Sequence, residues 1–153
     1  PGPRPRVAYG DAARGWAGMA ASHRRACLAA RVADAIEELD APAVGWEDLG
    51  VFQLLAQVPA EELGRSAMDD RIRRLADKPE LLHTLAVYLD AAGEAKRAAD
   101  KLALHRASLY YRLHRIEEIA GIDLHSGADR LAAHLSIGAL RLAGRIALPA
   151  RDG

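Results

Sequence analysis

The segment EAKRAADKLALHRASLYYRLHRIEEIAG, residues 94–121, decides the fold that this sequence predicts. It reads as a short helix, a tight turn and a longer helix. The first helix places small residues on one narrow face, which lets a second helix pack closely across it: Ala95, Ala98, Ala99 and Leu102. After Leu104 the apolar phase restarts as one stripe at helical spacing: Leu109, Leu113, Ile116 and Ala120. Together they have the pattern of a helix-turn-helix.

The residues at the ends of this segment support the same interpretation. Gly93 can end a preceding helix, because only glycine takes the left-handed conformation there at little cost, and Gly121 can close the second helix. Glu94 is a poor N-cap for the first helix. His105 stands at the start of the second helix, where we expect it to cap the first amides.

The side of the second helix opposite the apolar stripe is polar and basic. Segment 96–115 holds six Lys or Arg residues and one acid, Asp100, in a chain whose formal net charge is zero. Lys and Arg neutralise phosphates, and Ser, Tyr and Arg side chains can reach base edges or phosphate oxygens. On periodicity alone, a basic amphipathic helix is more often a solvated surface, so both interpretations stay open at this point.

Residues 93–124 strongly resemble the C-terminal helix-turn-helix domain of PucR/CdaR-type transcriptional regulators. The family pattern has a Gly before an Ala-rich helix ending in Leu, a His before the second helix, and then Tyr-Arg-Leu, Ile-Glu and Gly-x-Asp-Leu. The matching positions are Gly93, Ala99, Leu102, His105, Leu109, Tyr111, Arg112, Leu113, Ile116, Glu117, Gly121, Asp123 and Leu124. The chain departs from the family at Glu94, Ala107-Ser108 and Tyr110, where Asn, Asn-Thr and a basic residue are usual.

The resemblance implies a DNA-binding transcriptional regulator with double-stranded DNA as its partner. We expect the recognition helix, about 106–120, to lie in the major groove. The residues expected to contact base edges or phosphates are Arg106, Ser108, Tyr111 and Arg115, and those expected mainly to position the DNA backbone are Lys96, Arg97 and Arg112. Because one small domain buries little surface, we expect a homo-oligomer, a dimer on half-sites about one helical turn apart.

The alternative is a protein–protein interaction or dimerisation module that has lost strong DNA affinity. Glu94, Ala107 and Tyr110 would suit such a domain. A third option, nucleotide sensing by the N-terminal part, follows only from a weaker resemblance. Residues 6–63 resemble the end of the GGDEF-like domain that precedes the helix-turn-helix in this family, through Asp48-Leu49-Gly50 and Leu54-Leu55. No GGDEF active-site motif is present, so we expect no cyclase chemistry.

The predicted fold is mainly α: a C-terminal helix-turn-helix four-helix bundle, preceded by a mostly helical α+β remnant with two short strands. We place a domain boundary between residues 1–76, the end of the GGDEF-like domain, and 77–153, the DNA-binding domain. Strands are expected at 6–10 and 43–46, and helices at 16–39, 48–58, 59–75, 79–92 and 127–147. Expected inward residues of the first helix are Met19, His23, Cys27 (or Ala26), Ala30, Ala33 and Ile36, and those of the last are Leu131, Leu135, Ala139 and Leu142.

Composition argues against other classes of protein. Apolar residues make up 50 % of the chain and charged residues 27 %, and the single cysteine, Cys27, allows neither a disulfide framework nor a cysteine zinc site. The six histidines form no HxxxH pair, and the paired acids Glu61-Glu62 and Glu117-Glu118 have no evident acid–base partner. We therefore expect no enzyme, no catalytic residues, no metal and no cofactor.

The sequence also bears on where the chain works. It contains no apolar run of membrane-spanning length and no signal peptide, so we expect a cytoplasmic protein without a membrane partner. It begins PGPRP without a Met. We therefore expect a fragment, in which a small-molecule effector would act only through missing upstream domains.

Overall fold

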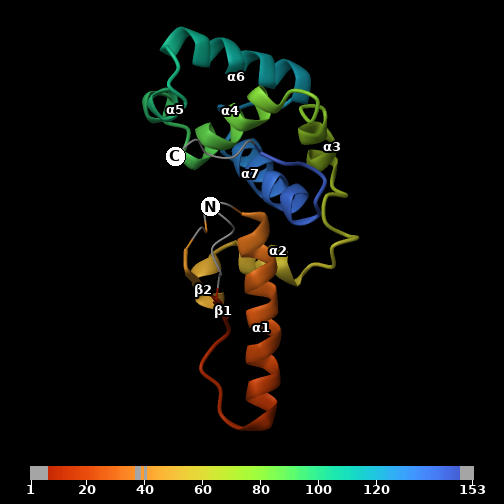
Figure 1. Cartoon of the computed structure of the whole chain (residues 1–153). Coiled ribbons are helices and arrows are strands. Elements are labelled where there is room, and N and C mark those ends of the chain that lie inside the picture. The colour runs from red at the N-terminus through yellow and green to blue at the C-terminus, as the bar shows by residue number, and fades with distance from the viewer. Residues whose placement is uncertain (1–6, 37–38, 40, 149–153) are drawn as a thin grey trace. The chain divides into compact units, whose positions relative to one another are not determined.

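The computed structural model describes residues 7–36, 39 and 41–148. The chain divides into two compact units, Pro1–Leu63 with Arg141–Gly144, and Gly64–Leu140 with Arg145–Gly153 (Figure 1). Helices dominate both, and two short strands complete the secondary structure of the described residues. The predicted mainly α fold is confirmed. No helix among the described residues is long and apolar enough to cross a membrane.

The first unit contains a two-stranded parallel sheet covered by one long helix. Strand β1 (Val7–Tyr9) pairs with β2 (Ala43–Gly45), with Val7 opposite Ala43, and α1 (Gly15–Ala35) connects them. A Cβ at Gly45 would lie 2.6 Å from the ring of Tyr9, so a larger residue there would displace that ring. Both predicted strands and the long helix are confirmed.

The inward side of α1 differs from the predicted one. Ala33 and Ile36 are buried as predicted, but Met19 is 53 % exposed, and His23 and Cys27 are also exposed. The remaining buried residues of the helix are Ala29 and Val32. Alanines occur all around α1, so its sequence defines no single apolar stripe, and burial is confined to the C-terminal half. Cys27 is therefore not the core residue that we expected; its Sγ lies 3.6 Å from His23 Nε2.

Two of the predicted helices are shorter in the structure than the sequence indicates. A 3₁₀ helix, η2 (Trp46–Leu49), and α2 (Phe52–Gln57) replace the helix expected at 48–58, because Gly50 between them takes a φ of 53°. The helix expected at 59–75 is formed only by α3 (Ala67–Arg73). Its start is fixed by Ser66, whose Oγ accepts from the Asp69 amide at 3.1 Å while the Asp69 carboxylate accepts from the Ser66 amide at 2.6 Å.

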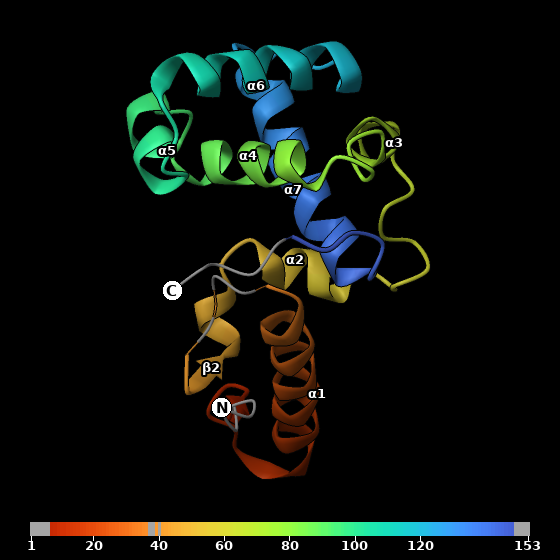
Figure 2. The ribbon, with the colours of Figure 1, turned by 45° about the horizontal axis from the view of Figure 1, so that its top comes forward.

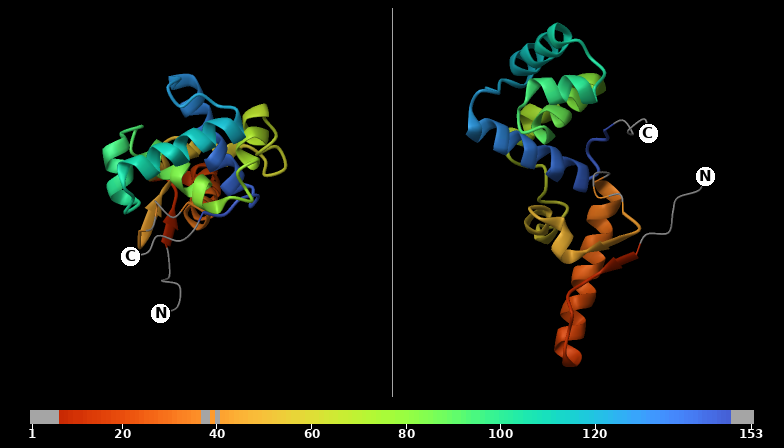
Figure 3. Two further views of the ribbon diagram at one scale, coloured as in Figure 1. Left: turned by 90° about the horizontal axis from the view of Figure 1, so that it is seen from above. Right: turned by 90° about the vertical axis from the view of Figure 1, so that its left-hand side faces the viewer.

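The second unit is built on α4 (Pro79–Asp90), α5 (Ala95–Lys101), α6 (Arg106–Ala120) and α7 (Gly127–Leu142). Helix α4 lies between α6 and α7 (Figures 1 and 3). Its buried apolar residues include Leu81, Leu82, Leu85 and Leu89. Pro79 occupies the first turn, and Lys78 is the N-cap, with no side-chain cap bond.

The core of the second unit extends beyond the four predicted helices. Ile72 and Leu75, in and just after α3, join the same apolar cluster as α4, α5, α6 and α7. This compact unit therefore begins at Gly64, before the position 76/77 at which the sequence places a domain boundary. The predicted boundary between a GGDEF-like domain and a DNA-binding domain at residues 76 and 77 stays a prediction.

Helix α7 turns a different side inward from the one predicted. Ala139 and Leu142 are buried as expected, but Leu131 is 62 % exposed. The buried stripe of α7 in the second unit is Ala133, Ser136, Ile137 and Leu140. His134 Nε2 lies 3.0 Å from the Asp90 carboxylate of α4 and so connects α7 to α4. Ser126 caps α7, with its Oγ accepting from the Asp129 amide at 3.2 Å.

Two leucines of α7 provide a matched test of this arrangement. Leu140→Ala removes a side chain that is fully buried, so we expect it to lower the free energy of unfolding by about 2–5 kcal/mol. Leu131→Ala should change it by less than about 0.5 kcal/mol. Urea denaturation of both variants measures the difference, and a large loss in Leu131→Ala would show that the rotation of α7 is wrong.

Candidate nucleic-acid interface

A four-residue corner joins α5 to α6. Ala103 takes a left-handed φ of 50°, and the Leu104 amide donates to the Ala99 carbonyl at 2.9 Å, which folds the chain back over the end of α5. His105 is the N-cap of α6, and its Nδ1 accepts from the Ala107 amide at 3.4 Å. The predicted capping role of His105 is confirmed. Glu94 caps α5 with no side-chain bond, as expected.

The inner sides of both helices are buried as the sequence predicts. Ala98 and Ala99 of α5 are at most 4 % exposed, so α6 packs closely against α5. The stripe of α6 lies in the core, together with α4: Leu109, Leu113, Ile116 and Ala120. Figure 2 shows α6 lying along α4, with α5 at one end. Burial of this stripe fixes the orientation of α6 about its own axis. It therefore determines which side chains of α6 point outward.

Hydrogen bonds hold the C-terminal end of α6, and several of the residues that match the family pattern take part in them. Gly121 takes the left-handed conformation with a φ of 67°, as predicted, and its amide donates to the Glu117 carbonyl at 2.8 Å. The Glu117 carboxylate accepts from the Leu124 amide at 2.9 Å, and Leu124 is buried. The Asp123 amide donates to the Asp129 carboxylate at 2.9 Å. Both ends of α6 are therefore fixed.

We call the exposed residues of α6 its outer face: Arg106, Ala107, Ser108, Tyr110, Tyr111, His114, Arg115 and Glu118. Tyr111 is 68 % exposed and Tyr110 is 51 % exposed. Large aromatic side chains in water cost free energy unless a partner covers them, and single exposed ones are common. Here two adjacent tyrosines stand among cations, which is the composition of a surface that contacts phosphates and bases.

At the start of the outer face, Arg106 stacks on Tyr110. Arg106 Cζ lies 5.8 Å from the centroid of the Tyr110 ring, and Arg106 Nη2 donates to the Tyr110 hydroxyl at 3.4 Å. This hydrogen bond, with a Coulombic contribution from Tyr110, raises the pKa of Arg106 above its already high ordinary value. Arg106 therefore stays charged, and its side chain lies along the helix surface.

Further along the outer face, one carboxylate pairs with two basic side chains. Glu118 accepts from Arg115 Nη1 at 2.6 Å, and its other oxygen lies 3.4 Å from His114 Nε2. All three side chains are exposed. The predicted contact residue Arg115 is thus ion-paired within its own helix, so any phosphate or base must compete with Glu118 for it.

Arg112 has a different environment from the other predicted contact residues. It is partly buried, and its Nη1 donates at 3.2 Å to the hydroxyl of Thr84, a fully buried residue of α4. The Thr84 hydroxyl in turn donates to the Glu80 carbonyl at 2.6 Å. We expected Arg112 on the surface; the structure instead makes it a link between α6 and α4.

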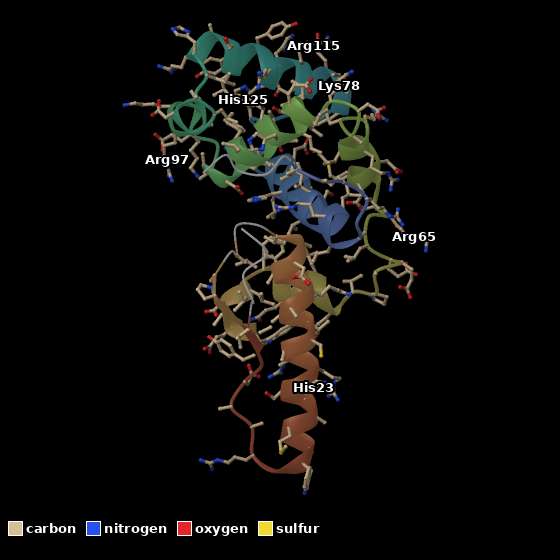
Figure 4. The ribbon with its side chains drawn as sticks, viewed as in Figure 1. His23, Arg65, Lys78, Arg97, Arg115 and His125 are labelled. Atoms are coloured by element: carbon tan, nitrogen blue, oxygen red, sulfur yellow. The ribbon has the colours of Figure 1, made fainter. Side chains whose placement is uncertain are left out.

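The two predicted contact residues of α5, Lys96 and Arg97, are exposed. Arg97 Nε lies 3.8 Å from the Glu94 carboxylate. Figure 4 shows Arg97 on α5 and Arg115 on α6, both at the surface of the second unit. Acids at 94 and 118 thus flank the basic segment, and the charge available to a partner is smaller than the count over 96–115 indicates.

Sequence reasoning omitted Tyr110, His114 and Glu118 from the proposed contacts. Their pairings follow helical spacing: Arg106 with Tyr110 and His114 with Glu118 are four residues apart, and Arg115 with Glu118 three. That spacing is visible in the sequence and would have identified them. The bond between Arg112 and Thr84 spans 28 residues and has no local signal.

Comparison with known proteins places this domain in a family. Residues 81–139 match the family model of the PucR C-terminal helix-turn-helix domain. The purine catabolism regulatory protein of Bacillus subtilis (strain 168) is 32 % identical over 96 residues, which cover 60 % of this chain and 18 % of that protein. An uncharacterized protein of Mycobacterium tuberculosis (strain ATCC 25618 / H37Rv) is 44 % identical over 55 residues, 35 % of this chain and 13 % of that protein. No solved structure gives a significant match.

These similarities confirm part of the predicted resemblance. Residues 81–139 match a PucR-type helix-turn-helix domain, and a relative that is named a regulatory protein is similar to part of the chain. The chain spans less than a fifth of the length of the curated relatives that it matches. The GGDEF-like assignment of residues 1–76 stays a prediction.

Two arginines of α6 provide a test of the geometry. We expect Arg112→Ala to lower the free energy of unfolding by about 1–2 kcal/mol, because it removes a charged hydrogen bond and packed methylenes between α6 and α4. Arg115→Ala, which breaks only an exposed ion pair, should cost less than about 1 kcal/mol. Urea denaturation distinguishes the two, and equal small losses would mean that Arg112 does not tie α6 to α4.

Proposed function

Because residues 81–139 form a PucR-type helix-turn-helix, we propose that the chain binds double-stranded DNA as part of a transcriptional regulator. The observation that carries this proposal is the exposed outer face of α6, which combines Arg106, Tyr111 and Arg115 on a helix whose other side is buried. A helix fits the major groove of B-DNA, where base edges present distinct donor and acceptor patterns. The outer face of α6 would lie against those edges.

The contact residues then have separate roles. Arg106, Ser108, Tyr111 and Arg115 would contact base edges or phosphates from α6, and Lys96 and Arg97 would position the backbone from α5. The bond to Thr84 supports a mainly structural role for Arg112, with its remaining N–H groups available to a phosphate. The Ala at 107 cannot donate or accept through its side chain, so contacts at its level would come from Ser108 and Tyr111.

A dimer on two half-sites is part of this proposal, since one such domain buries too little DNA surface for high specificity. Its half-sites would lie about one helical turn apart. The B. subtilis relative is named a purine catabolism regulatory protein. From the sequence resemblance and not from that name, we further propose that residues 1–76 are the end of a GGDEF-like domain and that a small-molecule effector acts through parts of the regulator outside this chain. We also propose that the protein works in the cytoplasm.

The second candidate is a protein-interaction module, and one observation favours it. Glu94 and Glu118 already pair with Arg97 and Arg115, which lowers the positive potential that phosphates would meet. Salt separates the two functions, because DNA binding releases counterions whereas an apolar protein interface does not.

Fluorescence anisotropy of the chain with mixed-sequence duplex DNA, over a series of salt concentrations, tests the proposed function. With about five phosphate contacts, the logarithm of the binding constant should fall with the logarithm of salt with a slope of about −4 to −5 per monomer. Dissociation constants of about 10⁻⁶ to 10⁻⁴ M are expected near physiological salt. No binding even at low salt would shift the assignment to the protein-interaction module.

Substitutions at the two members of the Arg115–Glu118 ion pair give a second test of DNA binding, because they change the charge of the outer face in opposite directions. Glu118→Gln releases Arg115 and removes a negative charge from the outer face, so binding to mixed DNA should tighten by about two- to fivefold. Arg115→Gln should weaken binding and reduce the magnitude of the salt slope by about 1. If both variants bind as the unchanged protein does, this part of α6 does not contact DNA.

A further inference from the structure

We propose that Tyr110 is a positioning residue that holds Arg106 ready to bind a guanine in the major groove. This inference rests on the proposed DNA binding and extends it to a particular base. The inference starts from the geometry at the beginning of α6.

Arg106 is the first residue of α6, and Tyr110 follows one turn later on the same side. The guanidinium carbon lies 5.8 Å from the ring centroid, while Nη2 donates to the phenol oxygen at 3.4 Å. A ring under the guanidinium and a hydrogen bond to one of its nitrogens restrict a side chain that is otherwise flexible. The remaining N–H donors of Arg106 stay available.

The electrostatics of the helix end make this cation unusual. A helix N-terminus carries a positive partial charge, so an arginine there is unfavourable for stability. The first turn of α6 contains no acidic residue to offset it. Arg97 and Arg115 have carboxylate partners, whereas the partner of Arg106 is a neutral phenol. Arg106 therefore keeps its full charge, and its free N–H donors can form charge-assisted hydrogen bonds with an acceptor on DNA.

The position and chemistry of Arg106 favour guanine as that acceptor. In a helix-turn-helix the N-terminal residues of the recognition helix approach base edges most closely. Guanine presents two acceptors in the major groove, O6 and N7, and a planar guanidinium binds both at once. Holding the fork in place beforehand reduces the entropy lost on binding, which is the contribution that Tyr110 would make. A phosphate contact of Arg106 would carry no preference for a base.

Guanine analogues test this inference with the whole chain. A preferred duplex is first selected from random sequences, and each guanine in it is then replaced singly by 7-deazaguanine, which still pairs with cytosine but lacks the N7 acceptor. At one position the replacement should weaken binding of the unchanged chain by roughly five- to a hundredfold. Arg106→Ala should bind the guanine and deazaguanine duplexes about equally at that position.

The tyrosine variants separate positioning from a structural role. Tyr110→Phe keeps the ring and should keep most of the guanine preference. Tyr110→Ala should lose most of that preference while keeping the salt slope of the unchanged chain, since its charge count is the same. Because Tyr110 is exposed, we expect the circular dichroism of both variants to be unchanged, and Tyr110→Leu provides a second ring-free variant if the alanine variant unfolds. Leu131→Ala, on α7, is the control for a surface change away from α6.

The possible outcomes distinguish a failure of the proposed DNA binding from a failure of the roles given to Arg106 and Tyr110. If the unchanged chain binds no DNA at low salt, the proposed function fails. If it binds and selects a duplex, but Arg106→Ala keeps the full response to every 7-deazaguanine, Arg106 does not bind guanine. If Arg106→Ala loses the response but both ring-free variants of Tyr110 retain it, the positioning role of Tyr110 is wrong while DNA binding and the guanine contact stand.

Discussion

The burial of one apolar stripe on α6 is the interaction on which the rest of this domain depends. Leu109, Leu113 and Ile116 lie in the core with the leucines of α4, and each fully buried leucine or isoleucine contributes about 1.5–3 kcal/mol. The same burial fixes the rotation of α6 and so decides which polar residues face outward. The stability of the domain and the proposed DNA recognition therefore depend on two sides of one helix, and a change of phase in the stripe would alter both.

The ends of α6 add precision that apolar packing alone does not provide. The His105 side chain caps the first amides, and the Glu117 carboxylate holds the Leu124 amide beyond the last turn. The bond from Arg112 to Thr84 adds a polar contact with α4 inside this frame. Side chains on a rigid element keep a defined position relative to a partner, which is what base recognition requires. The backbone is strained at the corner between α5 and α6, because Ala103 takes a left-handed conformation that favours glycine.

The sequence predicted the features that depend on local chemistry. The stripe of α6, the glycine at its end, the His105 cap and the two short strands all follow from spacing and residue type, whereas the parallel pairing of the strands was not predicted. The inward sides of α1 and α7 were partly wrong, because alanine-rich helices offer several similar stripes and tertiary contacts choose among them: Cys27 and Leu131 face outward. The role of Arg112 was hidden for another reason, since its partner lies on a different helix. Its pairing depends on the fold and not on spacing.

The central claim is that the outer face of α6 is the surface that meets DNA. Amide chemical-shift mapping of the nitrogen-labelled chain, titrated with duplex DNA, tests it most directly because it reports contact residue by residue. If the outer face of α6 contacts DNA, the largest chemical-shift changes are expected at Arg106, Ser108, Tyr111 and Arg115. Smaller changes are expected along α5, and little change at Leu131 or in α1. Shifts concentrated on the exposed side of α7 or in the first unit, with α6 unchanged, would contradict it.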